Sequence, residues 1–261
     1  IIASFLAVGA LSALYYADRL NQLPIGVIGI AVGTVLLPEM SRRLADGDAE
    51  GAAAAQKRAF ALTLLLSMPF LAAFLAVPDE IMRAMFARGA FTSANAAAAG
   101  ATLAAYAIGL VPFVLIRAAV APFYARQDTA TPMKAALIGI AVNVALKIAL
   151  AGPLAQVGLA LATSVGAWVN LGLVTWFATR AGHLSFDGPT RRDGLKFVVS
   201  GVILAAALWL AARGSAQAFS GMPSLRDETV LVVLIGVGAL VYGVAILALF
   251  GRAWLARLIR P

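Results

Sequence analysis

Residues 229–250 read TVLVVLIGVGALVYGVAILALF and contain no charged side chain. A helix of about 20 residues crosses the roughly 30 Å hydrocarbon core of a bilayer, so this stretch predicts a transmembrane helix. Similar apolar blocks recur along the chain, in which 62% of residues are hydrophobic and 12% are charged. These blocks are long runs that follow neither a helical nor a strand period. We therefore expect an all-α, polytopic membrane helix bundle.

Seven complete spans are predicted by the lengths of the apolar blocks. Residues 1–6 have the composition of the last turns of an eighth, and the chain starts without a methionine or a basic segment. We therefore expect a fragment of a longer protein, with no signal peptide at this point. Residues 78–86 are amphipathic but too short to cross, which predicts a helix in the membrane interface. The seven spans lie near residues 9–40, 59–77, 95–125, 132–151, 156–179, 195–212 and 229–250.

The residue types that build metal sites and catalytic centres are scarce. The chain has no cysteine and one histidine, which excludes a disulfide scaffold, a cysteine-ligated metal centre and a histidine cluster. We expect no bound metal and no cofactor. Asp18 and Glu39 are the only carboxylates inside spans and lie 21 residues apart, so no acid/base pair is visible. These features favour translocation over catalysis, and we expect that the protein is not an enzyme.

The net charge of +8 reflects an uneven distribution of basic residues between the loops. Four basic residues lie in one set of alternate loops, and thirteen lie in the opposite set and the tail. By the positive-inside rule the second set is cytoplasmic, which places the C-terminus inside. The expected partners of these charges are membrane lipids and not nucleic acid. The thirteen are Arg42, Arg43, Lys57, Arg58, Arg126, Lys134, Arg180, Arg191, Arg192, Lys196, Arg252, Arg257 and Arg260.

Three basic residues remain inside predicted spans: Arg19, Arg117 and Lys147. Arg19 lies about ten residues, or roughly 15 Å, from the outer end of its span, too deep for its side chain to reach the headgroups easily. Arg117 lies about 12 Å from the cytoplasmic end, where a binding site and snorkelling are equally reasonable. Lys147 is only about 6 Å from the outer end, so snorkelling is favoured there.

The deep arginine lies in the sequence Tyr15-Tyr16-Ala17-Asp18-Arg19-Leu20. Asp18 points about 100° away around the helix, whereas Gln22 shares the face of Arg19. One interpretation is a buried ion pair that fixes helix packing, although such pairs seldom repay desolvation. The favoured interpretation is an anion site, because a guanidinium forms bidentate hydrogen bonds with phosphate and does not deprotonate. We expect Arg19 and Arg117 to bind a phosphorylated substrate, supported by Asp18 and Gln22.

The same span carries a predicted hinge. Pro24 removes a backbone N–H from the helix, and Gly26 follows it, so Pro24 and Gly26 are expected to let the helix bend. Gly26, Gly29 and Gly33 form a small-residue face that permits close contact with another helix.

Several motifs together resemble the signature of the MurJ (MviN) lipid II flippases. One runs from Tyr15-Tyr16-Ala17-Asp18-Arg19-Leu20-Asn21-Gln22-Leu23-Pro24 through Gly33-Thr34 to Leu36-Leu37-Pro38. The others are Phe86-Ala87-Arg88-Gly89-Ala90-Phe91, Phe123-Tyr124-Ala125-Arg126-Gln127-Asp128 and Gly158-Leu159-Ala160-Leu161-Ala162-Thr163-Ser164. The specific motifs end near residue 180, and beyond it only hydropathy agrees.

This resemblance implies a fourteen-helix transporter of the multidrug/oligosaccharidyl-lipid/polysaccharide exporter (MOP) superfamily. Residues 1–180 would be its second lobe, from the end of helix 7 to helix 12, and residues 181–261 would be helices 13 and 14 with a basic cytoplasmic tail. The family flips undecaprenyl-diphosphate-linked peptidoglycan precursor, lipid II, across the bacterial plasma (inner) membrane by alternating access. Arg19 would match the family's central-cavity arginine, the last two helices would form a groove for the lipid tail, and the missing N-terminal lobe would be a partner.

Two positions depart from the family pattern. The family often has an acidic residue one turn after the cavity arginine, where this chain has Gln22. Some members bind a cation through an asparagine and an aspartate one turn apart, and the corresponding residues here are Asn143 and Lys147, with Thr163 matching a third position. The resemblance therefore implies a vestigial cation site in which the Lys147 ammonium replaces the ion, or coupling to membrane potential alone.

Three other interpretations remain open at this point. A related exporter could carry another lipid-linked glycan or a drug. An enzyme acting on polyprenyl phosphates would need aspartates or histidines that converge at a membrane face, and none converge in the sequence. A membrane scaffold would use Arg19 only in a structural ion pair.

Overall fold

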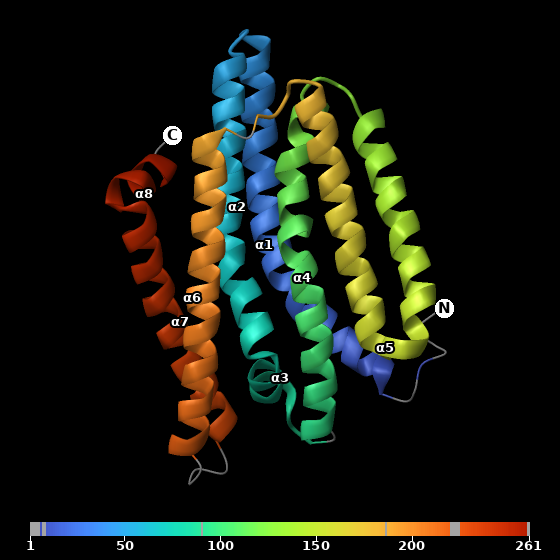
Figure 1. The fold of residues 1–261 in the computed structure, drawn as a ribbon, viewed down its shortest axis with the longest axis vertical. Helices are drawn as coiled ribbons and strands as arrows, with labels where there is room; N and C mark the ends of the chain where they lie inside the picture. The colour runs from blue at the N-terminus through green and yellow to red at the C-terminus, as the bar shows by residue number, and fades with distance from the viewer. Residues whose placement is uncertain (1–5, 7–8, 90, 186, 220–224, 260–261) are drawn as a thin grey trace.

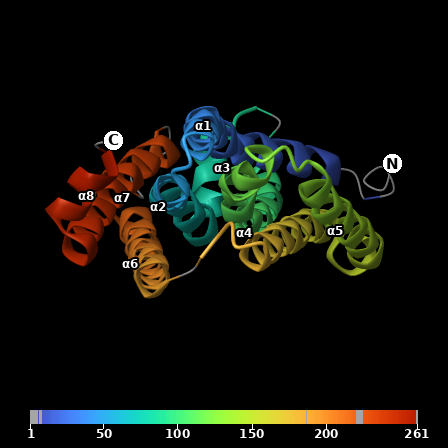
Figure 2. The same ribbon diagram turned by 90° about the horizontal axis from the view of Figure 1, so that it is seen from above.

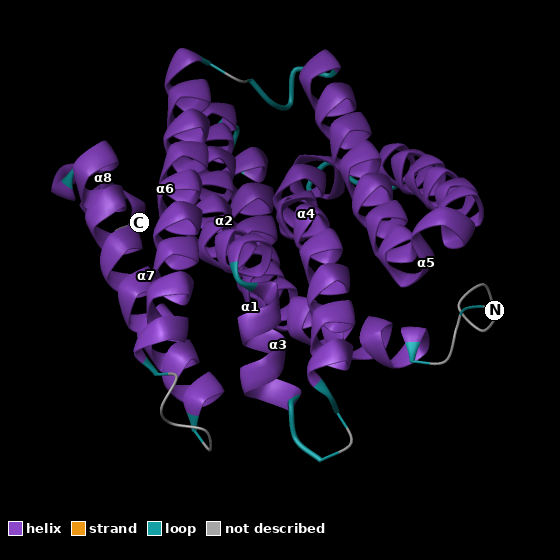
Figure 3. Cartoon of the chain, turned by 60° about the horizontal axis from the view of Figure 1, so that its bottom comes forward, coloured by secondary structure: helices purple, strands orange, loops and turns teal. Residues whose placement is uncertain are grey.

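The computed structural model describes residue 6 and residues 9–259, apart from 90, 186 and 220–224. Within these residues the chain is helical and contains no strand, as predicted (Figure 3). The expected turns at residues 1–6 fall almost entirely outside the described part. The helices are α1 (Ala10–Ala45), α2 (Ala49–Ala76), α3 (Pro78–Phe86), α4 (Ser93–Tyr124), α5 (Ala130–Arg180), α6 (Gly188–Ala218), α7 (Arg226–Phe250) and α8 (Arg252–Ile259).

Six of the described helices are long and apolar enough to cross a membrane. The longest, α5, has 51 residues and breaks at Ala155, whose φ of 46° and ψ of −127° are not helical. Its two arms run antiparallel (Figure 1). A Cβ atom built on Gly139 would lie 2.9 Å from the carbonyl oxygen of Gly166, so the arms touch through glycines. The two arms correspond to the predicted spans 132–151 and 156–179, and all seven predicted apolar spans are therefore found as helical segments.

Helix α4 lies at the centre of the bundle (Figure 2). It contacts α1, α2, α3 and α5, and many of its small side chains are fully buried. α6 and α7 pack beside α2 on the opposite flank from α5. Buried residues form two apolar clusters, one toward each end of the bundle, and α4 contributes to both. α1 packs on α4 and α2 and touches α5, and the side of α1 that faces away from these helices stays uncovered within the described structure.

Side chains from other helices bond to the backbone carbonyls that the prolines inside α2 and α4 leave without a donor. A proline leaves the carbonyl four residues earlier without its usual donor. The carbonyl of Leu65, four residues before Pro69, accepts a 2.7 Å hydrogen bond from the hydroxyl of Tyr242 in α7. Such side-chain donors satisfy backbone groups that no water can reach in a bilayer.

The two prolines of α4 follow the same rule. The carbonyl of Ile108, four residues before Pro112, accepts a 2.9 Å hydrogen bond from the indole N–H of Trp168 in α5. The carbonyl of Ala118, four residues before Pro122, accepts a 3.2 Å hydrogen bond from the buried amide of Gln56 in α2. These bonds fix α4 against both of its large neighbours.

Charged residues fasten the ends of the helices. At the end where α3 meets α7, Arg83 lies 3.6 Å from Asp227, and Arg88 lies 3.0 Å from Glu228. At the other end, Lys57 bonds to Asp187, the N-cap of α6, and this contact holds the pKa of Asp187 well below its usual range. Helix α3 confirms the short helix predicted at residues 78–86.

The predicted basic tail forms a further helix, α8, which lies against the end of α2. The guanidinium Nε of Arg58 donates a 2.8 Å hydrogen bond to the carbonyl of Leu258. Trp254 donates to Asp193 of α6 at 3.1 Å. Hydropathy alone did not predict this docking, because the bonds join positions far apart in the sequence.

Candidate functional site

Arg19 projects from the uncovered side of α1. Its side chain is exposed, and its guanidinium lies over the ring of Tyr15, 5.0 Å from the ring centre. Within the described residues, no carboxylate oxygen comes within 4.0 Å of Arg19. The ion-pair interpretation of Arg19 therefore finds no partner in this part of the protein.

Asp18 and Gln22 form a pair of their own. The side-chain amide of Gln22 donates a short hydrogen bond to the Asp18 carboxylate one turn away. Asp18 is half-buried whereas Arg19 is exposed, so the two neighbouring side chains leave α1 in different directions. The sequence placed Gln22 on the face of Arg19, whereas the structure shows that the contact of Gln22 is with Asp18.

Arg117 reaches α1 from α4. A Cβ atom built on Gly29 would lie 3.7 Å from Cγ and 3.9 Å from Nε of Arg117, so this side chain crosses α1 at Gly29. Gly29 lies ten residues after Arg19, about 15 Å along α1 and roughly 80° around its axis. The structure therefore does not bring the two predicted cations together.

The predicted hinge lies between these two positions. α1 changes direction along its length (Figure 1), and Pro24 lies within it. A side chain added at Gly26 or Gly33 would meet no described atom within 4 Å. The small-residue face is therefore not used for close helix contact within the described structure, and only Arg117 covers it, at Gly29.

The residues of the predicted cation site lie on the two arms of α5. Asn143 packs against Gly166 of the opposite arm, and its amide oxygen is buried without a hydrogen bond. The Thr163 hydroxyl donates to the Leu159 carbonyl at 3.0 Å. Lys147 is half-buried, and no described carboxylate pairs with it. Among the described residues, histidines and carboxylates form no metal-binding group of three.

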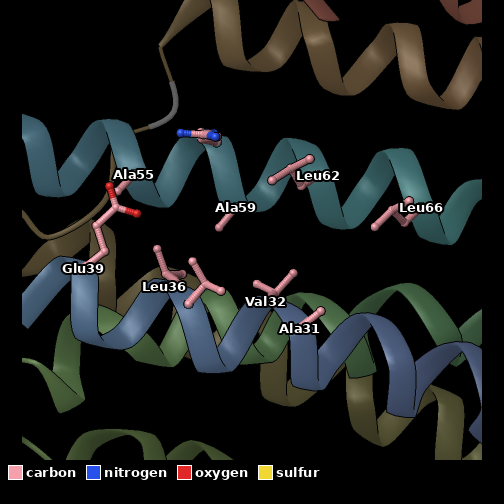
Figure 4. Close-up of a pocket in the computed structure, with 10 residues that line it drawn as sticks. Ala31, Val32, Leu36, Glu39, Ala55, Ala59, Leu62 and Leu66 are labelled. Atoms are coloured by element: carbon pink, nitrogen blue, oxygen red, sulfur yellow. The ribbon is translucent and has the colours of Figure 1, made fainter. Parts of the chain in front are cut away.

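Apolar grooves flank α2 within the described structure, and two of them adjoin α1 or α7. One, of about 250 Å³, lies between α1 and α2 (Figure 4) and has Glu39 and Arg58 among its lining residues. The other, of about 330 Å³, lies between α2, α3, α6 and α7 and is lined almost wholly by apolar side chains, with Phe70, Leu208 and Leu231 among them. Neither groove could be located from the sequence, because each is formed by helices that are distant along the chain.

The family model described as "Lipid II flippase MurJ" matches residues 1–226. A probable lipid II flippase MurJ of Rhizobium tropici is 42% identical over 237 residues, which is 90% of this chain and 44% of that protein. The counterpart in Rhizobium meliloti is 45% identical over 203 residues, covering 78% of this chain and 38% of that protein. This chain spans about half the length of the curated relatives it matches.

Solved structures agree with this match. A lipid II flippase MurJ in an inward closed conformation superposes with a TM-score of 0.78 at 25% identity, covering 99% of this chain and 50% of that one. An outward-facing multidrug resistance transporter of the MATE family, in the MOP superfamily, has a TM-score of 0.61 at 18% identity over 99% of this chain and 61% of its own. The second likeness concerns the fold alone.

Proposed function

Because this chain belongs to the lipid II flippase MurJ family, we propose that it forms half of a transporter that flips lipid II from the inner to the outer leaflet of the bacterial plasma membrane. In this proposal, residues 1–180 form the second lobe, and residues 181–261 supply helices 13 and 14. The first lobe belongs to the same protein and packs over the uncovered side of α1. The protein that contains both lobes is then a transporter and not an enzyme.

The observation that carries this proposal is the state of Arg19. An exposed guanidinium within an apolar helix, without a carboxylate partner among the described residues, has its N–H groups available to an anion. The diphosphate of lipid II is an anion of the geometry that arginine binds best. Asp18 accepts a hydrogen bond from Gln22 and, although its charge acts on the neighbouring Arg19, the two form no ion pair within 4.0 Å.

Arg117 has a separate role in the same proposal. Since about 15 Å of α1 separates Gly29 from Arg19, one diphosphate would contact the two cations in turn as α1 bends at Pro24 and Gly26. Arg117 then provides the position nearer the cytoplasm, and Arg19 the position nearer the outer leaflet. The lipid tail would occupy the apolar groove between α2, α3, α6 and α7, whose volume is about 330 Å³.

The orientation follows from charge. Thirteen lysines and arginines fall outside the predicted spans on the side of the C-terminus, which supports a cytoplasmic C-terminus in the inner membrane. For Lys147 we propose that its ammonium replaces the cation that the family resemblance implies at this place, near Asn143 and Thr163 on the arms of α5. No metal ion is then needed to keep the arms together.

The test is complementation in cells depleted of their own lipid II flippase. We expect that Arg19→Ala abolishes growth although the protein reaches the membrane in normal amounts. Arg19→Lys should be nearly as poor, because an ammonium is a point charge that does not form the planar fork. Arg88→Ala is the matched control, since Arg88 pairs with Glu228 at a helix end and should not bind substrate.

Lipid analysis decides the substrate. Cells with Arg19→Ala should accumulate lipid II in the cytoplasmic leaflet and then lyse. Accumulation of a different lipid-linked glycan would assign the protein to another exporter of the superfamily. Normal growth and normal lipid II distribution with Arg19→Ala would refute the site.

A further inference from the structure

Arg19 is held by an aromatic ring and not by a counter-ion. Side chains four residues apart lie on one face of a helix and lean toward its N-terminus, so Arg19 reaches back over Tyr15. The separation of 5.0 Å between the guanidinium carbon and the ring centre lies within the roughly 6 Å range of cation–π attraction. Tyr15 itself is 56% exposed, so its ring contributes little to the core of the bundle.

A carboxylate and an aromatic ring contact different parts of an arginine side chain. A carboxylate uses N–H groups, as Glu39 and Asp48 do with Arg43 at 3.1 and 3.0 Å. A ring attracts the cation through its π-face and accepts no conventional hydrogen bond, so a guanidinium that lies flat on a ring keeps the N–H donors in its plane available. The contact with Tyr15 can therefore hold Arg19 without using the groups that would bind a phosphate.

The Tyr15 ring is anchored in turn. It meets the ring of Tyr16 edge-on, with centres 5.8 Å apart. Tyr16 packs against Phe86 of α3 at 4.7 Å and against Phe91 at 5.0 Å. A series of aromatic contacts thus connects Phe86 and Phe91, through Tyr16 and Tyr15, to the guanidinium of Arg19. These contacts give the two phenylalanines of the Phe86–Phe91 motif a physical connection to the cation.

We propose that Tyr15 is a positioning residue for substrate binding: its ring holds the Arg19 guanidinium flat and directs the N–H edge of Arg19 toward the phosphorylated headgroup. This inference rests on the proposed function, because it deepens the role of the same arginine. Tyr15 acts through its aromatic face, and its hydroxyl is dispensable.

The chain contains matched controls for this geometry. Arg213 lies 3.6 Å from the ring centre of Trp209, and Arg180 lies 4.5 Å from that of Trp176, both at the same four-residue spacing. Those two arginines lie near the ends of their helices, where aromatic and basic side chains commonly meet the membrane interface. Removal of their rings tests whether any such stack matters for transport.

The experiment compares Tyr15→Phe, Tyr15→Trp and Tyr15→Leu in the full-length gene product that carries this chain. Binding of undecaprenyl diphosphate to purified protein in nanodiscs is measured alongside complementation and membrane abundance. Tyr15→Leu should weaken binding roughly tenfold, the scale of one cation–π contact in a site shielded from water. Tyr15→Phe and Tyr15→Trp should stay within about twofold of the parent protein, because their rings keep the attractive face. Trp209→Leu should bind normally.

Two results would overturn the inference. One is normal binding by Tyr15→Leu, and the other is loss in Tyr15→Phe as large as in Tyr15→Leu, since a hydroxyl contact would then explain the effect. The double variant Tyr15→Leu/Arg19→Ala should be no worse than Arg19→Ala, because Tyr15 acts through Arg19. If Arg19→Ala itself binds and transports normally, the proposed function fails whatever Tyr15 does. If Tyr15→Leu binds normally while Arg19→Ala does not, the proposed arginine site is retained, and the contact between Tyr15 and Arg19 has no role in binding.

Discussion

Pro24 in α1 and Pro69 in α2 each remove a backbone donor from an apolar helix, but their surroundings differ. The carbonyl that Pro69 frees, that of Leu65, is bound by Tyr242 from α7 at 2.7 Å. The corresponding carbonyl for Pro24 is that of Leu20, and no described side chain donates to it. The prolines of α4 resemble Pro69, since Trp168 and Gln56 supply their missing donors.

This difference separates helices that are fixed from a helix that can bend. A proline whose carbonyl is capped from another helix becomes part of the packing, because bending would break the cap. A proline without a cap leaves a weak point in the hydrogen-bond ladder. The weak point of α1 lies five residues after Arg19, so bending there would move the cation relative to α4. The comparison therefore predicts opposite results for mutations at the two kinds of proline.

Among the proline variants, the largest effect on transport is expected for Pro24→Ala. Alanine restores a donor for the Leu20 carbonyl and straightens α1, so transport should fall at least tenfold, or about 1.4 kcal/mol. Thermal stability of the purified protein should stay equal or rise, because alanine favours helix. Transport is measured by growth of depleted cells at equal protein levels. Full transport with Pro24→Ala would show that bending at this proline is not required.

Tyr242→Phe should lower the free energy of unfolding. It removes only the hydroxyl and leaves the Leu65 carbonyl without its donor, at a cost of about 2 kcal/mol. Thermal unfolding in detergent measures this loss. The matched test adds Pro69→Ala, which returns a backbone donor to Leu65 and should recover most of the loss. Equal losses with and without Pro69→Ala would contradict the capping role of Tyr242.

A smaller loss is expected for Trp168→Phe. The indole of Trp168 is 46% exposed and Ile108 is 40% exposed, so their bond lies at the surface of the bundle, where another polar group can approach the freed carbonyl more easily than at Leu65. The free energy of unfolding should fall by about 1 kcal/mol or less. A loss larger than that of Tyr242→Phe would mean that exposure does not set the strength of these caps.

The smallest effect is expected for Pro38→Ala, the control for Pro24→Ala. Pro38 also lies in α1 without a described cap, but it is exposed and close to the end of the helix. Since Pro38 is exposed and lies nineteen residues after Arg19, transport should change by less than about twofold, or 0.4 kcal/mol. A defect as large as that of Pro24→Ala would remove the special role of the position beside Arg19.

The sequence was a good guide wherever hydropathy decides the structure. The seven spans, the short helix at residues 78–86 and the break between the arms of α5 were all predicted. The predicted spans 132–151 and 156–179 placed the break between residues 151 and 156, and the non-helical residue is Ala155. Helix ends were less accurate: α2 begins at Ala49, ten residues before the predicted span, since polar residues extend a helix beyond the bilayer core.

Side-chain partners could not be read from the sequence to the same extent. The spacing of Arg19 and Gln22 suggested a shared face, but Gln22 bonds to Asp18 instead. The stack of Arg19 on Tyr15 was missed, although the four-residue spacing of an aromatic residue and an arginine was visible. Arg117 was placed with Arg19, and the structure separates the two by three turns of α1.

The sequence by itself determined which segments are membrane helices and which cations lie within them, because the transfer of an apolar helix into hydrocarbon depends mainly on its own length and composition. Only the tertiary structure decided which polar groups are satisfied and which stay free. Tyr242 and Leu65 are 177 residues apart, and Gln56 and Ala118 are 62 apart, so no local pattern reveals these bonds. In a medium without water, each such contact decides whether a helix is fixed or can move, and whether a buried charge is neutralised or available to a ligand.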